Sequence, residues 1–75
     1  MALEPTVAPG SAADGRFVRD LGLERSVLLV AIRRGGTTVV PKGDTRLEPG
    51  DRVALIAPSA LAERVRGLFR TQDGR

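Results

Sequence analysis

The apolar positions between residues 26 and 58 form short runs whose spacing is typical of strands. Residues 27–32 are apolar at every position, which indicates a strand that is buried on both faces. The next run is β-branched, and the last one alternates. These patterns predict strands over residues 26–34, 37–40 and 52–57.

Turn signals separate these runs. Gly35 and Gly36 predict a tight hairpin between the first two strands. Glu48-Pro49-Gly50-Asp51 suits a type II turn, with proline second and glycine third, where φ is positive. Asp51 is expected to bond the backbone of that turn. Residues 3–7 contain a proline and predict at most a short edge strand.

Two flanking segments predict helices. Ser11 and Asp14 have the spacing of a capping box and predict a helix over residues 12–21, which Gly22 would end. Residues 60–69 predict a second helix, which Ser59 would cap. Its apolar stripe has helical spacing and consists of Leu61, Val65, Leu68 and Phe69.

The elements together predict one α+β domain over residues 1–75, with its core over about residues 5–69. Its order is β-α-β-β-β-α, and its small sheet is mostly antiparallel. Two short helices can cover one face of such a sheet but not both. Because residues 27–32 indicate burial on both faces, we expect a second copy of the chain to cover the other face, which gives a homodimer. A central strand that the single chain covers unaided is the alternative.

The composition excludes several kinds of catalytic and metal site. The 75 residues include no cysteine and no histidine, which removes thiolate metal sites, the commonest general base and the commonest metal ligand. No nucleophile–base pair stands out and the acids are scattered over turns and helix surfaces, so we expect no enzyme, no metal and no cofactor. The longest apolar run has six residues, too few for a membrane span, and residues 1–10 do not look like a signal peptide. We expect a cytoplasmic domain, and a piece of a longer chain is compatible with its first residues.

Arg33 and Arg34 at the end of the first long strand are the leading site candidates. Neighbours on a strand point to opposite faces. Arg34 would therefore share its side with Ile32, Val30 and Leu28, and Arg33 would share its side with Ala31, Leu29 and Val27. An apolar wall that ends in a guanidinium suits an anionic ligand with a flat apolar part, such as a nucleotide. Two solvated charges at a hairpin end are the alternative interpretation.

The loop after the next strand is the second candidate. Lys42 beside Gly43 could meet a phosphate, although the glycine spacing and the strand-to-helix context of a P-loop are missing. An ordinary polar loop is the alternative, and the local residues favour it. The net charge of +3 is compatible with an anionic ligand. Only Phe17 and Phe69 are aromatic, so nucleic acid is not the expected partner.

The order and spacing of these motifs resemble the RCK C-terminal domain, also called the TrkA-C domain. The resemblance covers roughly residues 5–69 and rests on I-x-R at Ile32 and Arg34, on Pro41, and on L-x-x-G-D at residues 47–51. It implies a dimeric regulatory domain of potassium channels, potassium uptake systems or cation/proton antiporters, held at the inner membrane by a parent or partner transporter. Several members bind cyclic di-AMP between two protomers.

By this resemblance, the cleft that binds the nucleotide would be lined by residues at the end of the long strand and just after the next one. They are Ile32, Arg34, Val40 and Pro41, with Arg33, Lys42 and Gly43 as neighbours. Two other functions stay open. One is an AbrB-like DNA-binding module, which also uses short strands and an L-x-x-G-D turn. The other is a dimerisation domain with no ligand.

Overall fold

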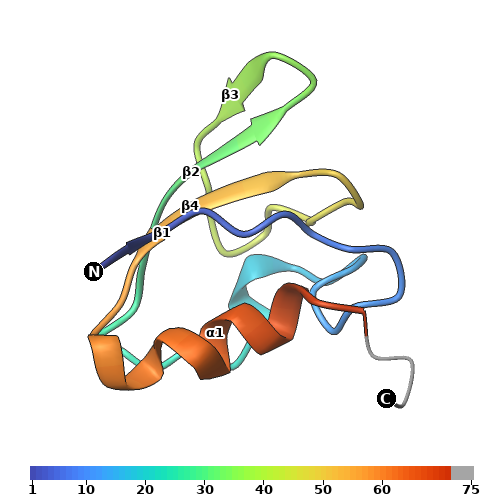
Figure 1. Cartoon of the computed structure of the whole chain (residues 1–75). Coiled ribbons are helices and arrows are strands. Elements are labelled where there is room, and N and C mark those ends of the chain that lie inside the picture. Colours follow the sequence, from blue (N-terminus) through green and yellow to red (C-terminus); the bar gives the residue numbers. More distant parts are fainter. Residues whose placement is uncertain (72–75) are drawn as a thin grey trace.

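The computed structural model describes residues 1–71, which form a four-stranded antiparallel sheet with one α-helix against it (Figure 1). The strand order in the sheet is β1-β4-β2-β3. The strands are β1 (Ala2–Leu3), β2 (Leu28–Arg34), β3 (Thr37–Val39) and β4 (Arg52–Ile56). The predicted α+β class and mostly antiparallel sheet are confirmed.

The closing helix lies on one face of the sheet (Figure 1). A 3-10 turn, η2 (Ser59–Leu61), leads into α1 (Ala62–Phe69). Val65 and Phe69 of the predicted stripe are buried, and Leu61 and Leu68 pack against the core. The predicted cap is wrong, because the side chain of Ser59 makes no capping bond and α1 begins after Leu61.

The helix predicted over residues 12–21 is wrong, and only the 3-10 turn η1 (Val18–Asp20) forms there. Gly15 has a φ of 77°, a left-handed conformation that a right-handed helix does not allow. The Asp14 carboxylate accepts a bond from the Gly10 amide at 2.8 Å and closes a turn instead of a capping box. The backbone then pairs with residues 43–47, including a bond from Gly15 N to Leu47 O of 3.0 Å. These long-range backbone bonds replace helical ones.

A bulge in β2 changes which residues share a face. Leu29 lies opposite Leu55, whereas Ala31 lies opposite Ala54, so Val30 is an extra residue in β2. Side chains therefore alternate on each side of the bulge, but the two faces are exchanged across it. Leu29 is on the side of Ile32 and Arg34, while Val30 is not. The expected wall of Leu28, Val30, Ile32 and Arg34 is wrong for this reason.

The two faces of the sheet are covered very differently. One face, here called the core face, packs against α1 and the loops with Leu29, Ile32, Val53 and Leu55. The other, here called the outer face, carries apolar and basic side chains: Leu28, Val30, Arg33, Arg52, Ala54 and Ile56. Leu28, Val30 and Ile56 are 60%, 52% and 48% exposed. The single chain thus leaves uncovered the face for which the sequence predicts a partner.

Candidate functional site

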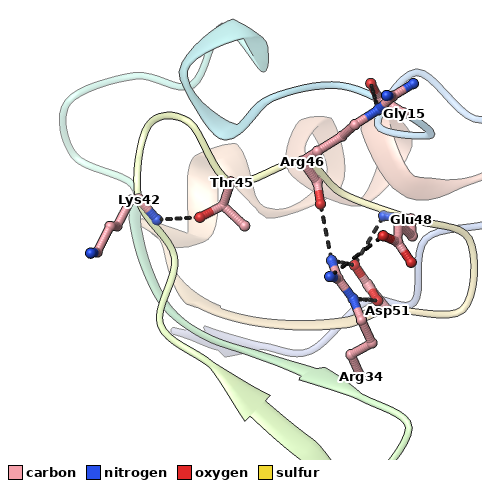
Figure 2. Close-up of polar contacts among 7 residues, drawn as sticks. All are labelled: Gly15, Arg34, Lys42, Thr45, Arg46, Glu48 and Asp51. Atoms are coloured by element: carbon pink, nitrogen blue, oxygen red, sulfur yellow. Dashed lines mark hydrogen bonds and ion pairs between the residues drawn. The ribbon is translucent and has the colours of Figure 1, made fainter.

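Arg34 and Asp51 form an ion pair between the end of β2 and the turn before β4 (Figure 2). Arg34 donates from Nε to Asp51 Oδ1 at 2.9 Å and from Nη2 to Asp51 Oδ2 at 2.7 Å. Its Nη2 also donates to the Arg46 carbonyl at 2.9 Å, and Nη1 lies 3.5 Å from a carboxylate oxygen of Glu48. Asp51 is only 1% exposed. The Arg34 guanidinium is therefore engaged within the domain.

The charges of this pair stabilise each other. The hydrogen bonds from Arg34 hold the pKa of Asp51 below its ordinary value, against the opposing effect of burial, and the Glu48 amide adds a bond at 2.9 Å. The same bonds to Asp51 raise the pKa of Arg34. Both groups stay ionised at neutral pH, and neither is poised for proton transfer.

The ion pair explains two motifs that are far apart in the sequence. It joins the arginine of I-x-R to the aspartate of L-x-x-G-D. The predicted role of Asp51 in the turn is confirmed by its bond from the Glu48 amide, and Gly50 has the positive φ, 92°, that the turn needs. Arg34 therefore positions the hairpin end and the turn relative to each other.

Arg33 has the opposite environment. It lies on the outer face between Thr38 of β3 and Arg52 of β4. Its side chain is exposed and makes no hydrogen bond or ion pair with any residue of the described part of the chain. Arg52 is paired with Glu4 at 3.1 Å. Arg33 is thus an available cation beside the apolar side chains of the outer face.

The other predicted site residues divide into buried and exposed ones. Ile32 is 0% exposed and belongs to the core, whereas Val40 is 71% exposed. Pro41 is half-buried, and Lys42 and Gly43 lie in an exposed loop. The Lys42 amide bonds the Thr45 hydroxyl at 2.9 Å, while its ammonium points away from the Arg34–Asp51 pair (Figure 2). Ligand contact by these residues stays a prediction, and the structure makes Arg33 and Val40 more accessible than Ile32 and Arg34.

A shallow hollow of about 490 Å³ lies on the outer face, on residues that motif reasoning did not select. It is lined by Ala2, Leu3, Glu4, Val30, Ala54, Leu55 and Ile56. The alternation of Arg52, Ala54 and Ile56 in the sequence could have indicated it. Within residues 1–71, no three side chains of His, Cys, Asp or Glu gather as metal ligands. In the same part of the chain, the helices are too short and too polar to cross a membrane.

Relatives of known sequence are transport proteins. The chain is 40% identical over 67 residues to a TrkA homolog of a Trk potassium uptake system from Archaeoglobus fulgidus, a match that covers 89% of this chain and 15% of that protein. It is 46% identical over 45 residues to the putative Na⁺/H⁺ antiporter YjbQ of Bacillus subtilis, a match that covers 60% of this chain and 7% of that protein. The chain therefore spans only a small part of these relatives.

Solved structures share the fold. A structure described as an RCK domain with cda superposes with a TM-score of 0.79 at 20% identity, over 92% of this chain and 97% of that one. An RCK_C domain dimer of S. agalactiae BusR in complex with c-di-AMP superposes with a TM-score of 0.76 at 22% identity, over 91% of this chain and 93% of that one. The sequence model of the TrkA-C domain matches residues 3–70, almost the whole described chain. This chain belongs to the TrkA-C domain family.

Proposed function

We propose that this chain is a cytoplasmic regulatory domain of a potassium uptake or cation/proton antiport protein, and that it dimerises through the outer face of its sheet. The observation that carries the proposal is the exposed apolar surface formed by Leu28, Val30 and Ile56. Isolated exposed apolar residues are common, but three on one face of a small sheet form a patch typical of an interface. The transport relatives and the family match support the regulatory role.

The ligand of this domain, in our proposal, is an anionic nucleotide such as cyclic di-AMP, held where the outer faces of two protomers meet. Arg33 would pair with a phosphate, because its donors are unused and its planar fork suits phosphate oxygens. Val40, just beyond β3, would contact the flat base. The BusR dimer, whose complex holds c-di-AMP, supports this choice of ligand. In this account Arg34 does not touch the nucleotide but holds the end of β2 in place.

Regulation would follow from differential affinity. A nucleotide that binds one relative arrangement of the two protomers more tightly shifts the dimer toward that arrangement, and an attached transporter can sense the shift. A ligand with equal affinity for both arrangements would change nothing. The domain needs no catalytic group for this role. The family match favours this function over the AbrB-like alternative.

Calorimetric titration with cyclic di-AMP tests the ligand. The wild-type domain should bind one nucleotide per dimer, and Arg33→Gln should weaken binding about tenfold because one charge-assisted contact is lost. Arg25→Gln removes the same charge from another exposed position and should leave binding unchanged. A dimer that gives no heat with about 100 μM nucleotide would support the dimerisation domain without a ligand instead.

A further inference from the structure

Strand β1 lies at one edge of the sheet and has a partner on one side only. Along residues 1–7, the odd-numbered residues direct their backbone N–H and C=O groups toward β4. The Met1 carbonyl accepts a bond from the Ala57 amide at 2.9 Å, the Pro5 carbonyl accepts one from Val53 at 2.9 Å, and the Val7 amide donates to Asp51 at 2.8 Å. The backbone thus stays extended beside β4 as far as Val7, beyond the end of β1 itself.

The even-numbered residues of this segment present their peptide groups to the open side. The amides and carbonyls of Glu4 and Thr6 make no hydrogen bond within residues 1–71. The N–H that Pro5 lacks falls on the side of β4, because the carbonyl of Pro5 faces that side. The proline therefore weakens the inner ladder and leaves the donors of the outer edge in place. Free groups on alternate residues are a template for one more strand.

A groove of about 340 Å³ runs beside this edge, between the N-terminal segment and α1. Its helix side is lined by Arg66, Phe69 and Arg70. The only charged partner of these arginines within the described chain is Glu63, which lies 3.8 Å from Arg66 Nη1 and 2.6 Å from Arg70 Nη1. Both guanidiniums are partly exposed and share one carboxylate. The helix side of the groove therefore has an excess positive charge.

We propose that this edge binds an extended acidic segment of a partner protein, which adds to the sheet beside β1 and directs two carboxylates to Arg66 and Arg70. The spacing suits such a segment. Arg70 directly follows the last residue of α1, so its Cα lies about 6 Å from that of Arg66 along the helix axis. Alternate residues on a strand are about 6.7 Å apart. Two carboxylates on alternate residues can then face both arginines while the backbone pairs with Glu4 and Thr6.

Charge disfavours a second copy of this chain as the occupant. Two β1 edges paired around a two-fold axis would bring the Arg66 and Arg70 pair of each copy to the same seam. Like charges at such a seam oppose association. The site also differs from the outer face, because the edge offers backbone groups and the outer face offers side chains. Binding at this edge can therefore be tested independently of the dimer proposed above.

A titration with designed peptides tests the site. The probe is a capped nine-residue peptide of alternating valine and glutamate, and its control has lysine in place of every glutamate. In nitrogen-15 NMR spectra of the whole chain, the glutamate peptide should shift the amides of Glu4 and Thr6 and slow their hydrogen exchange. The lysine peptide should leave both amides unchanged at about 1 mM. Equal binding of both peptides, or binding of neither, would overturn the proposal.

Charge reversal tests the contribution of the two arginines to binding, and N-methylation of the peptide tests the contribution of backbone hydrogen bonds. The double change Arg66→Glu with Arg70→Glu should abolish binding of the glutamate peptide and create binding of the lysine peptide, while Arg25→Glu should change neither. Two peptides should be compared, one methylated on its odd-numbered amides and one on its even-numbered amides. One of them should lose binding and the other should keep it, because only one set of amides faces β1. This last test changes only the peptide, so folding of a variant cannot confuse it. If the two methylated peptides bind equally, or if the shifts fall on the amides of Val30 and Ile56, the edge is not the site.

Discussion

Leu55 and Leu28 are leucines on neighbouring strands, yet they lie on opposite faces of the sheet and in opposite environments. Leu55 is 1% exposed against α1 and the loops, whereas Leu28 is 60% exposed. Arg34 and Arg33 repeat the contrast, because Arg34 is bound to Asp51 on the core face and Arg33 is unpaired on the outer face. The comparison separates residues that hold this domain together from residues that remain available to a partner.

The first prediction uses the same substitution on both faces. Leu55→Ala should lower the free energy of unfolding by about 3 kcal/mol, because it leaves a cavity in a packed core. Leu28→Ala should lower it by less than about 0.5 kcal/mol when the chain is monomeric, since most of its side chain is already exposed to water. Urea unfolding at low protein concentration measures both. Similar losses at the two positions would remove the distinction between the faces.

The second prediction concerns the ion pair. Asp51→Asn should lower the free energy of unfolding by about 2 kcal/mol, less than for a fully buried pair because the Arg34 side chain is 34% exposed and water screens it. Asp44→Asn removes the same charge from an exposed loop and should have an effect below about 0.5 kcal/mol. Urea unfolding of both variants at neutral pH makes the comparison. If they unfold alike, Arg34 is not held by Asp51 in solution.

The third prediction is a pH dependence with a definite sign. The folded domain holds the pKa of Asp51 below its ordinary value of 3.8, so the stabilisation is complete above that value and is lost as the pH falls through the folded-state pKa. Below about pH 4, wild-type stability should therefore fall more steeply than that of Asp51→Asn, and the two should converge. Urea midpoints across this pH range show whether they do. A constant difference down to pH 2 would exclude Asp51 as the titrating group.

The smallest effect concerns the outer face. Arg33 and Arg52 are directly opposite each other on adjacent strands, an unfavourable arrangement of like charges. Arg33→Glu should raise monomer stability by about 0.5 kcal/mol at low salt and by less at high salt, because opposite charges then face each other. The same change should abolish nucleotide binding. A loss of stability would mean that Arg33 supports the fold rather than a ligand.

Much of this contrast could be predicted from the sequence, and the part that could not has a specific cause. The strands, the turns and the need to cover residues 27–32 on two sides followed from local patterns. The assignment of Arg34 to an apolar wall failed because the extra residue Val30 changes the alternation of side chains. A bulge is fixed by pairing with β4, and an unbroken apolar run gives no sign of it.

The prediction of a helix over residues 12–21 was wrong for a related reason. Its capping signal was local, but residues 15–18 form backbone bonds with residues 45–47, far along the chain. Local motifs suggested Arg33, Arg34, Lys42 and Gly43 as site residues, and the family resemblance added Ile32, Val40 and Pro41. Neither source shows on which face each residue lies once a bulge is present. Arg33 and Arg34 were predicted together as the leading candidates, and only Arg33 is available, because Asp51 engages Arg34.

The central claim is that a second copy of the chain covers the outer face. Sedimentation velocity over a concentration series tests it most directly, with wild type, Ile56→Asp and the control Ala60→Asp, which adds the same charge at an exposed position away from this face. Wild type and Ala60→Asp should form dimers with similar affinity, and Ile56→Asp should weaken the dimer at least about a hundredfold by burying an unpaired charge. A dimer of Ile56→Asp as tight as that of the wild type, or a wild type that stays monomeric throughout, would contradict the account.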